Sequence, residues 1–324
     1  MARADRPAAP ARKRRAWTLD RASFLLVFLG LPLAIYLIFV VSPLLQAVGY
    51  SFTNWNGFNA NQTFVGLDNY ARLLDDTVFM TAVRNNILMA IVLPVLVIVL
   101  ALALATMVTV GGSSYGNTRG IKGAGFYRVV SFFPYAVPAI IVGIMWSLIF
   151  DPSSGLVNGI LTGLGFERFE SYAWLGDSRT AMPVMLFVMM WSFVGFYMVL
   201  FVAAIKSIPA EIFEAARLDG VGRFRTAVRI TVPLIRDNVQ TAWVYLGITA
   251  IDAFVFAQAL NPNGGPENST LTMSQRLLVT AFEKGQFGLA CAMGVVMGLL
   301  TMAFAGLVFL INNATGGRDR VSLA

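Results

Sequence analysis

The sequence predicts an all-α protein that crosses a membrane about six times. Of its 324 residues, 57% are hydrophobic and only 13% are charged, and six long apolar runs alternate with polar connections. A typical soluble domain carries about 25% charged residues. Because a helix needs roughly 20 apolar residues to cross the hydrocarbon core of a bilayer, each run is long enough to span it.

The six apolar runs differ in character. The first follows a basic leader, is too long for the core of a signal peptide and has no small-residue cleavage site after it, which favours an uncleaved membrane helix. The fifth contains polar residues such as Thr249 and Asp252. They indicate a helix that is shielded from lipid or lines a polar path, and a buried structural helix explains them equally well. The runs cover residues 24–48, 87–110, 129–150, 182–205, 239–260 and 287–311.

Lysine and arginine are concentrated on one side of the predicted membrane. With the N-terminus inside, 18 of the 24 basic residues precede the first span, lie in the second-to-third and fourth-to-fifth connections, or follow the last span. Six lie on the other side. Basic loops are retained in the cytoplasm, so both termini are predicted to be cytoplasmic. This placement accounts for the net charge of +7 without nucleic-acid binding.

The spans divide the chain into four predicted regions. Residues 1–22 form a basic cytoplasmic tail, since their Ala, Pro and Arg content cannot build a core. Residues 23–81 hold the first transmembrane helix and an extracytoplasmic loop. Residues 82–312 form a core of five transmembrane helices, with a long cytoplasmic loop at about 206–235. Residues 313–324 form a second cytoplasmic tail.

The cytoplasmic loop contains a short amphipathic helix. Pro209 suits the first turn of a helix, Glu211 and Glu214 favour its positive end, and Gly220 suits its termination. The apolar residues between them cannot all face water, so part of this helix must pack against the protein, the membrane or another subunit. An ordinary helical connection is the alternative.

The spacing within this loop resembles the EAA loop of permease subunits in bacterial ATP-binding cassette importers. Val221 stands where that family usually has alanine, and Val232 where it usually has leucine, and both changes are conservative. The matching residues are Glu214, Ala215, Ala216, Asp219, Gly220, Ile230 and Pro233.

Further segments resemble the carbohydrate-uptake branch of these permeases, and their order is similar to the first permease of a two-permease sugar importer. The matches extend from residue 64 to the last apolar run. They are residues 64–70 (FVGLDNY), Asn85-Asn86, residues 263–266 (NGGP), Ala281-Phe282 and Phe287-Gly288.

This resemblance implies a type I importer permease in the bacterial inner membrane that imports a di- or oligosaccharide by alternating access. Glycerol phosphate is the alternative to a sugar as the substrate. The implied partners are a second permease, two ATPase subunits that bind ATP and magnesium, and an extracytoplasmic solute-binding protein. The short helix would be the coupling helix that contacts the ATPase. Its contact residues would be Ile212, Phe213, Glu214, Ala215, Ala216, Leu218, Asp219 and Gly220.

The family's central cavity implies a solute pathway along the fourth and fifth spans. Aromatic faces and hydrogen-bonding side chains are the groups that bind sugars. Core packing explains any one of these residues at least as well. The implied pathway residues are Phe193, Phe196, Tyr197, Gly247, Ala250, Ile251 and Phe254.

Missing motifs narrow the function further. The chain has no G-x-x-x-x-G-K-[ST] sequence, the motif that binds nucleotide phosphates. ATP hydrolysis is therefore expected in a partner subunit, and this chain is expected to bind no cofactor. Histidine is absent and Cys291 is the single cysteine, which removes the usual metal sites, any intrachain disulfide and most constellations for an intramembrane enzyme. An ion-coupled carrier or a channel for small polar solutes is the alternative function, with Asp252 as its one clear intramembrane carboxylate.

Overall fold

The computed structural model describes residues 23–59, 62–109 and 123–316, and these residues are almost entirely helical. The predicted tail over residues 1–22 and most of the tail over 313–324 lie outside the described residues. The chain forms two compact units, one up to Gly49 and one from Tyr50 onward. Each unit is described by itself below.

The first unit is a single long helix that continues to Tyr50. It runs from Ser23 and consists of α2 (Leu31–Tyr36) and α3 (Ser42–Tyr50), with wider π-type turns at Leu26–Gly30 and Leu37–Val41. None of its residues is buried. This helix is long and apolar enough to cross a membrane, as the first predicted span requires.

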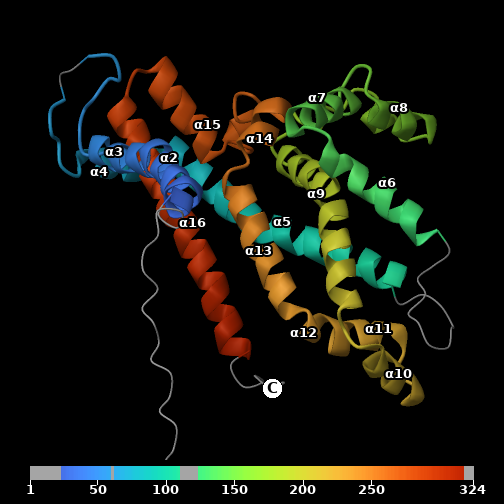
Figure 1. The fold of residues 1–324 in the computed structure, drawn as a ribbon. Helices are drawn as coiled ribbons and strands as arrows, with labels where there is room; N and C mark the ends of the chain where they lie inside the picture. The colour runs from blue at the N-terminus through green and yellow to red at the C-terminus, as the bar shows by residue number, and fades with distance from the viewer. Residues whose placement is uncertain (1–22, 60–61, 110–122, 317–324) are drawn as a thin grey trace, which may run out of the picture. The chain divides into compact units, whose positions relative to one another are not determined.

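Four long helices form the frame of the second unit. They are α5 (Thr77–Thr109), α9 (Ala181–Lys206), α13 (Arg236–Ile251) and α16 (Phe287–Gly316). Helix α5 packs against α9 and α13, and α16 runs beside α13 (Figure 1). The core between these helices contains fully buried Met89, Leu93, Met185, Met198 and Leu246.

Two of the predicted spans are broken helices. Helices α6 (Ala124–Ala136) and α7 (Ala139–Ile149) meet at 95°, and α13 and α14 (Phe254–Leu260) meet at 48°. Pro138 lacks an N–H and disfavours helical geometry at Val137, so the prediction of one continuous helix over residues 129–150 is wrong. Among the residues that the structure describes, four helices are by themselves long and apolar enough to span a membrane, and six spans result if each bent pair counts as one.

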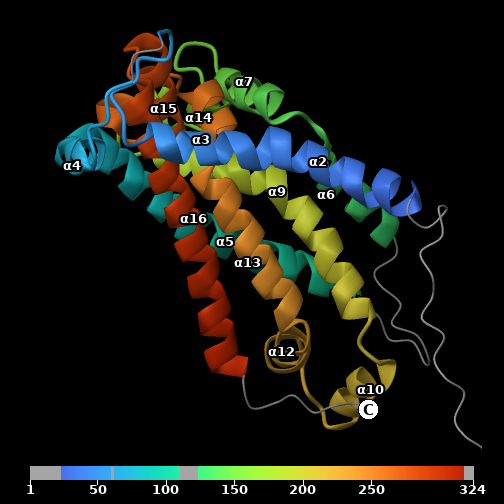
Figure 2. The same ribbon diagram turned by 60° about the vertical axis from the view of Figure 1, so that its left-hand side comes forward.

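The short elements gather at opposite ends of the second unit. Helices α10 (Ala210–Leu218), α11 (Arg223–Thr226) and α12 (Val232–Leu234) lie at one end, and α4 (Asp68–Asp75), α14 and α15 (Met273–Leu278) at the other (Figures 1 and 2). Helix α8 (Leu156–Gly163) follows α7. Single turns complete the unit at Glu167–Phe169, Ala227–Thr231, Pro266–Asn268 and Val279–Glu283.

Glycines allow helices to approach closely in two places. A Cβ on Gly195 of α9 would overlap the backbone of Ser131 in α6, and one on Gly143 of α7 would overlap Ala259 of α14. Small residues at such crossings are typical of membrane proteins, in which close van der Waals packing holds helices together.

A single asparagine of α5 forms hydrogen bonds with the backbone at the break between α13 and α14. Fully buried Asn86 donates from Nδ2 to the carbonyl oxygens of Ala250 and Ile251, at 3.2 and 2.8 Å. Its Oδ1 accepts from the amide of Met273, at 2.8 Å, where α15 begins. One side chain therefore satisfies two helix ends that would otherwise leave polar backbone groups unpaired in an apolar region.

Neighbouring polar side chains extend this junction. Asn85 Nδ2 donates to the carbonyl oxygens of Asn268 and Leu271, at 2.9 and 3.0 Å. Thr272 and Gln275 form a reciprocal capping box at the start of α15, and Gln275 Nε2 also donates to the carbonyl of Asn261 at 3.0 Å. The connection between α14 and α15 is thus fixed to α5 by hydrogen bonds.

An ion pair joins the starts of α5 and α15. Arg276 Nη2 lies 2.7 Å from Asp76 Oδ2, and both side chains are mostly buried. Asp76 Oδ1 accepts from the amides of Val78 and Phe79, so the carboxylate also caps α5. Burial raises the pKa of Asp76, but the bonds from Arg276 and Phe79 outweigh it and hold the pKa below its usual value.

We expect Asn86→Leu to lower the stability of the purified chain, because three backbone groups lose their partner. The expected cost is about 1–3 kcal/mol for each buried group left unsatisfied, so the midpoint of thermal unfolding in detergent should drop clearly. Asn238→Leu is the control, since Asn238 is exposed on α13. Equal midpoints for the two variants would contradict the role of Asn86.

We expect the stabilising effect of Asp76 to depend on pH. A carboxyl group with a lowered folded-state pKa contributes stability above its unfolded pKa of about 3.9, and the contribution disappears as pH decreases through the folded value. Asp76→Asn should therefore unfold more easily than the wild type at pH 7, by about 1 kcal/mol, and this difference should become smaller as the pH decreases below the unfolded pKa. Denaturant titrations at pH 7 and below the unfolded pKa measure this difference, and a pH-independent gap would refute it.

Candidate functional site

Helix α10 has the ends that the sequence predicts. It begins after Pro209 and ends before Gly220, whose φ of 69° is readily adopted by glycine. At its C-terminus the amide of Val221 donates to the carbonyl of Ala216 at 2.9 Å, and the amide of Gly220 to that of Arg217 at 3.0 Å. These bonds satisfy carbonyls that a helix end leaves free, so α10 is a discrete and defined helix.

The two faces of α10 have different environments. Phe213 is only 4% exposed, Ala216 is buried, and Ile212 is partly buried. On the other face Glu214, Ala215, Leu218, Asp219 and Gly220 are exposed, and the side chain of Leu218 is 89% exposed. The eight predicted contact residues therefore divide into three that attach α10 to this chain and five that are open to a partner.

A second exposed apolar residue lies on the following helix. Phe224 of α11 is 81% exposed, at the same end of the unit as α10. Sequence reasoning missed it, because the surrounding arginines were counted only for topology. The available signal was an aromatic residue in a loop that is otherwise basic and polar.

The predicted pathway residues do not share one surface. Gly247 packs against Phe304, Ala250 and Ile251 are buried beside Asn86, and Tyr197 is buried in the core. These four residues are inaccessible from outside the unit in this conformation, which favours packing roles. Their assignment to a pathway stays a prediction.

Three aromatic residues of the predicted pathway are partly exposed, namely Phe193, Phe196 and Phe254. The ring of Phe196 stacks on Tyr135 of α6, with centroids 4.5 Å apart. Phe193 packs edge-on against Phe256 of α14 at 5.8 Å. These side chains therefore contribute to an aromatic surface shared by α6, α9 and α14.

Helix α13 presents a polar stripe that the helical spacing brings together. Tyr245, Thr249 and Asp252 follow at intervals of four and three residues, and thus lie on one face. Tyr245 is 63% exposed and Asp252 is also exposed. Asp252 Oδ1 accepts from the hydroxyl of Ser274 at 3.4 Å. A polar, exposed stripe on a membrane-spanning helix is suited to a partner subunit or a water-filled path.

Within the described part of the chain, no group of three or more His, Cys, Asp or Glu residues is arranged to hold a metal ion.

Comparison with known proteins identifies the family. Residues 108–316 match the family model described as "Binding-protein-dependent transport system inner membrane component". The chain is 55% identical over 307 residues to the diacetylchitobiose uptake system permease protein NgcF of Streptomyces coelicolor, covering 95% of this chain and 87% of the relative. It is 33% identical to the probable ABC transporter permease protein YurN of Bacillus subtilis, covering 85% of this chain and 91% of the relative.

A solved structure shares the fold. The chain is similar to a subunit in the crystal structure of a bacterial alginate ABC transporter in complex with an alginate pentasaccharide-bound periplasmic protein. The TM-score is 0.77 at 19% sequence identity, covering 92% of this chain and 96% of the other. Together with the sequence matches, this similarity shows that the chain belongs to the family of inner-membrane components of binding-protein-dependent transport systems, the permease subunits of ATP-binding cassette importers.

Proposed function

We propose that this chain translocates a disaccharide of the diacetylchitobiose class into the cytoplasm by alternating access, with ATP hydrolysed by separate subunits. The observation that carries the coupling role is α10, a defined helix that is attached through Phe213 and exposed along its opposite face. The substrate class is supported by the 55% identity to a permease of diacetylchitobiose uptake, which extends over nearly the whole chain.

The ATPase contact would be made by the exposed face of α10. Leu218 and Phe224 are large apolar side chains exposed at the same end of the unit, and exposed apolar residues are typical of sites where proteins interact. Glu214 is also exposed, and in the sequence it lies between the buried Phe213 and the exposed Leu218. A partner that holds this face can move α10, and the buried Phe213 transmits the movement to the membrane helices.

The proposed orientation of the chain in the membrane is supported by the charge at one end of the second unit. The basic connection that holds α10 to α12 would be cytoplasmic, and the end with α4, α14 and α15 would be extracytoplasmic. The latter end would receive solute from a binding protein, as in the alginate transporter complex named above. The assembly would contain a second permease and two ATPase subunits in addition to this chain.

The solute path would combine the aromatic surface with the polar stripe of α13. Sugar rings present apolar C–H faces to aromatic rings, and their hydroxyl groups need hydrogen-bonding side chains. Phe196 and Phe254 supply partly exposed rings, and Tyr245 and Asp252 supply polar groups. The path would lie between this surface and the second permease.

We expect Glu214→Lys and Leu218→Asp to reduce ATP-dependent uptake by the assembled transporter by at least about tenfold, because interface anchors typically contribute 2 kcal/mol or more. Both residues are exposed, so membrane insertion and thermal stability should be unchanged. Uptake of labelled substrate into proteoliposomes, and co-purification of the ATPase, provide the readouts.

Two matched variants control this experiment. Glu211→Lys makes the same charge change one turn earlier on α10, and Leu218→Met keeps an apolar side chain at the contact position; both should retain most of the uptake. Normal transport by Glu214→Lys and Leu218→Asp would exclude α10 from the coupling.

We expect Phe196→Ala and Phe254→Ala to raise the KM for uptake by about five- to tenfold, since each removes an aromatic contact of about 1 kcal/mol or more. Phe309→Ala is the control, because Phe309 is exposed on the outer part of α16. Initial uptake rates over a range of substrate concentrations measure KM. An unchanged KM and substrate profile for both variants would remove these residues from the path.

A further inference from the structure

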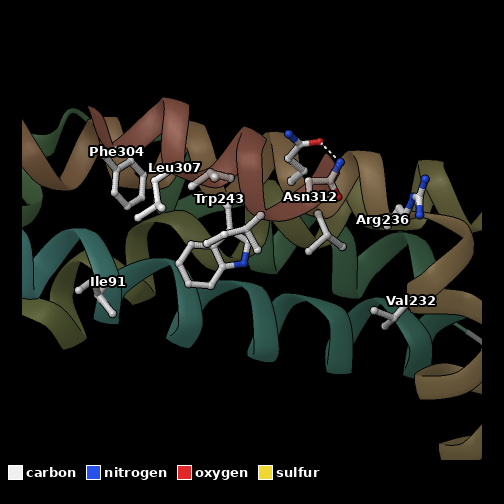
Figure 3. A pocket seen from close by; sticks show the side chains of 11 residues that line it. Ile91, Val232, Arg236, Trp243, Phe304, Leu307 and Asn312 are labelled. Atoms are coloured by element: carbon white, nitrogen blue, oxygen red, sulfur yellow. Dashed lines mark hydrogen bonds between the residues drawn. The ribbon is translucent and has the colours of Figure 1, made fainter. Parts of the chain in front are cut away.

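A groove of about 440 Å³ lies between α5, α13 and α16 near the end that carries α12. Figure 3 shows Trp243 in its centre, Arg236 at one end, and Ile91 and Phe304 toward the other. Ile91 and Leu307 on its walls are about half exposed, so the groove opens to the outside of the unit. Its size is within the range of small-molecule sites, roughly 300–1,000 Å³.

The groove changes from charged to apolar along α13. Arg236, Gln240 and Trp243 are spaced by four and three residues, so they lie on one face. With a rise of 1.5 Å per residue, Gln240 lies about 6 Å and Trp243 about 10 Å beyond Arg236 along the helix. Along the groove wall a cation is therefore followed by an amide and then by an aromatic ring. Past Trp243 the wall is formed by the apolar side chains of Phe304 and Leu307 (Figure 3).

The amide in the middle of this series has one unmatched donor. Gln240 Oε1 accepts from Asn312 Nδ2 of α16 at 2.5 Å, which fixes the orientation of the side chain. Its Nε2 is buried and has no hydrogen-bond partner within the described residues. A polar amide is therefore held between the charged and the apolar parts of the groove wall.

We propose that this groove binds one anionic phospholipid of the cytoplasmic leaflet. The phosphate lies at Arg236, the ester groups lie beside Gln240, and an acyl chain runs over Trp243, Phe304 and Leu307. The leaflet assignment rests on the orientation given under the proposed function. The groove wall is charged, then polar, then apolar, which is the order of headgroup, ester groups and acyl chain in such a lipid. A soluble solute and an apolar helix do not have this order of groups.

Charge favours an anionic headgroup over a zwitterionic one. Besides Arg236, the connection before α13 carries exposed Arg225 and Arg229 at the same end of the unit. A basic residue near the membrane surface attracts anionic lipid by about 1 kcal/mol, which corresponds to about a fivefold preference. Arg236 is distinguished from the other two because it lines the groove itself.

Bromine atoms on an acyl chain quench tryptophan fluorescence at short range, which allows a direct test on the assembled transporter in nanodiscs. The signal of Trp243 is the difference between wild type and Trp243→Phe. Half-maximal quenching should need about fivefold less brominated phosphatidylglycerol than brominated phosphatidylcholine. Arg236→Gln should abolish this preference, whereas Arg236→Lys and the matched control Arg225→Gln should retain it.

Three outcomes would overturn the lipid site. They are equal quenching by the two lipids, a preference that persists in Arg236→Gln, and no quenching of Trp243 in the assembled transporter, which would mean that another subunit covers the groove. Quenching is read without ATP or substrate, and ATP-dependent uptake is measured in parallel. Loss of coupled uptake with a retained lipid preference would count against the proposed function alone.

Discussion

The architecture of the second unit depends on satisfying the backbone of broken helices inside an apolar environment. A continuous helix pairs its own amides and carbonyls, but a break exposes several of them where no water can replace the lost bonds. Asn86 resolves this at the break between α13 and α14 by binding two carbonyls and one amide. The polar residues Asn85 and Gln275 do the same for the connection that follows.

The same constraint separates the rigid and the open parts of the molecule. The end with α14 and α15 is held by side-chain hydrogen bonds and by the pair between Asp76 and Arg276. The opposite end, with α10 and α11, is attached mainly through apolar contacts such as Phe213 and carries exposed apolar side chains. One end is held within the chain by polar contacts, and the other leaves large apolar side chains exposed.

Local signals in the sequence predicted the features that depend on local structure. Pro209 and Gly220 mark the ends of α10, the apolar runs mark the spans, and the motif around Glu214 led to the family that the comparisons confirm. The start of α5 at Thr77, rather than at residue 87, was missed because Arg84, Asn85 and Asn86 interrupt the apolar pattern. In fact those two asparagines are buried or partly buried partners for other helices.

The side of each helix that faces a path was not predictable, for a physical reason. Helix α9 is apolar on nearly every face and α13 on the faces that carry Gly247 and Ala250, so the sequence does not distinguish a side chain that packs from one that lines a cavity. Gly247 and Ala250 illustrate this, since they face Phe304 and Asn86 within the chain. Tyr245 and Phe224 became apparent only from their exposure in the folded unit.

The contact between Gly195 and Ser131 has a mechanical consequence. Because no side chain separates the two backbones, α6 and α9 have little freedom to slide, and α9 ends three residues before α10. A displacement of α10 would carry α9 and α6 together as one stiff arm. The flexible joints would then lie elsewhere, and the right-angled corner at Val137–Pro138, where α6 meets α7, is where such an arm would pivot.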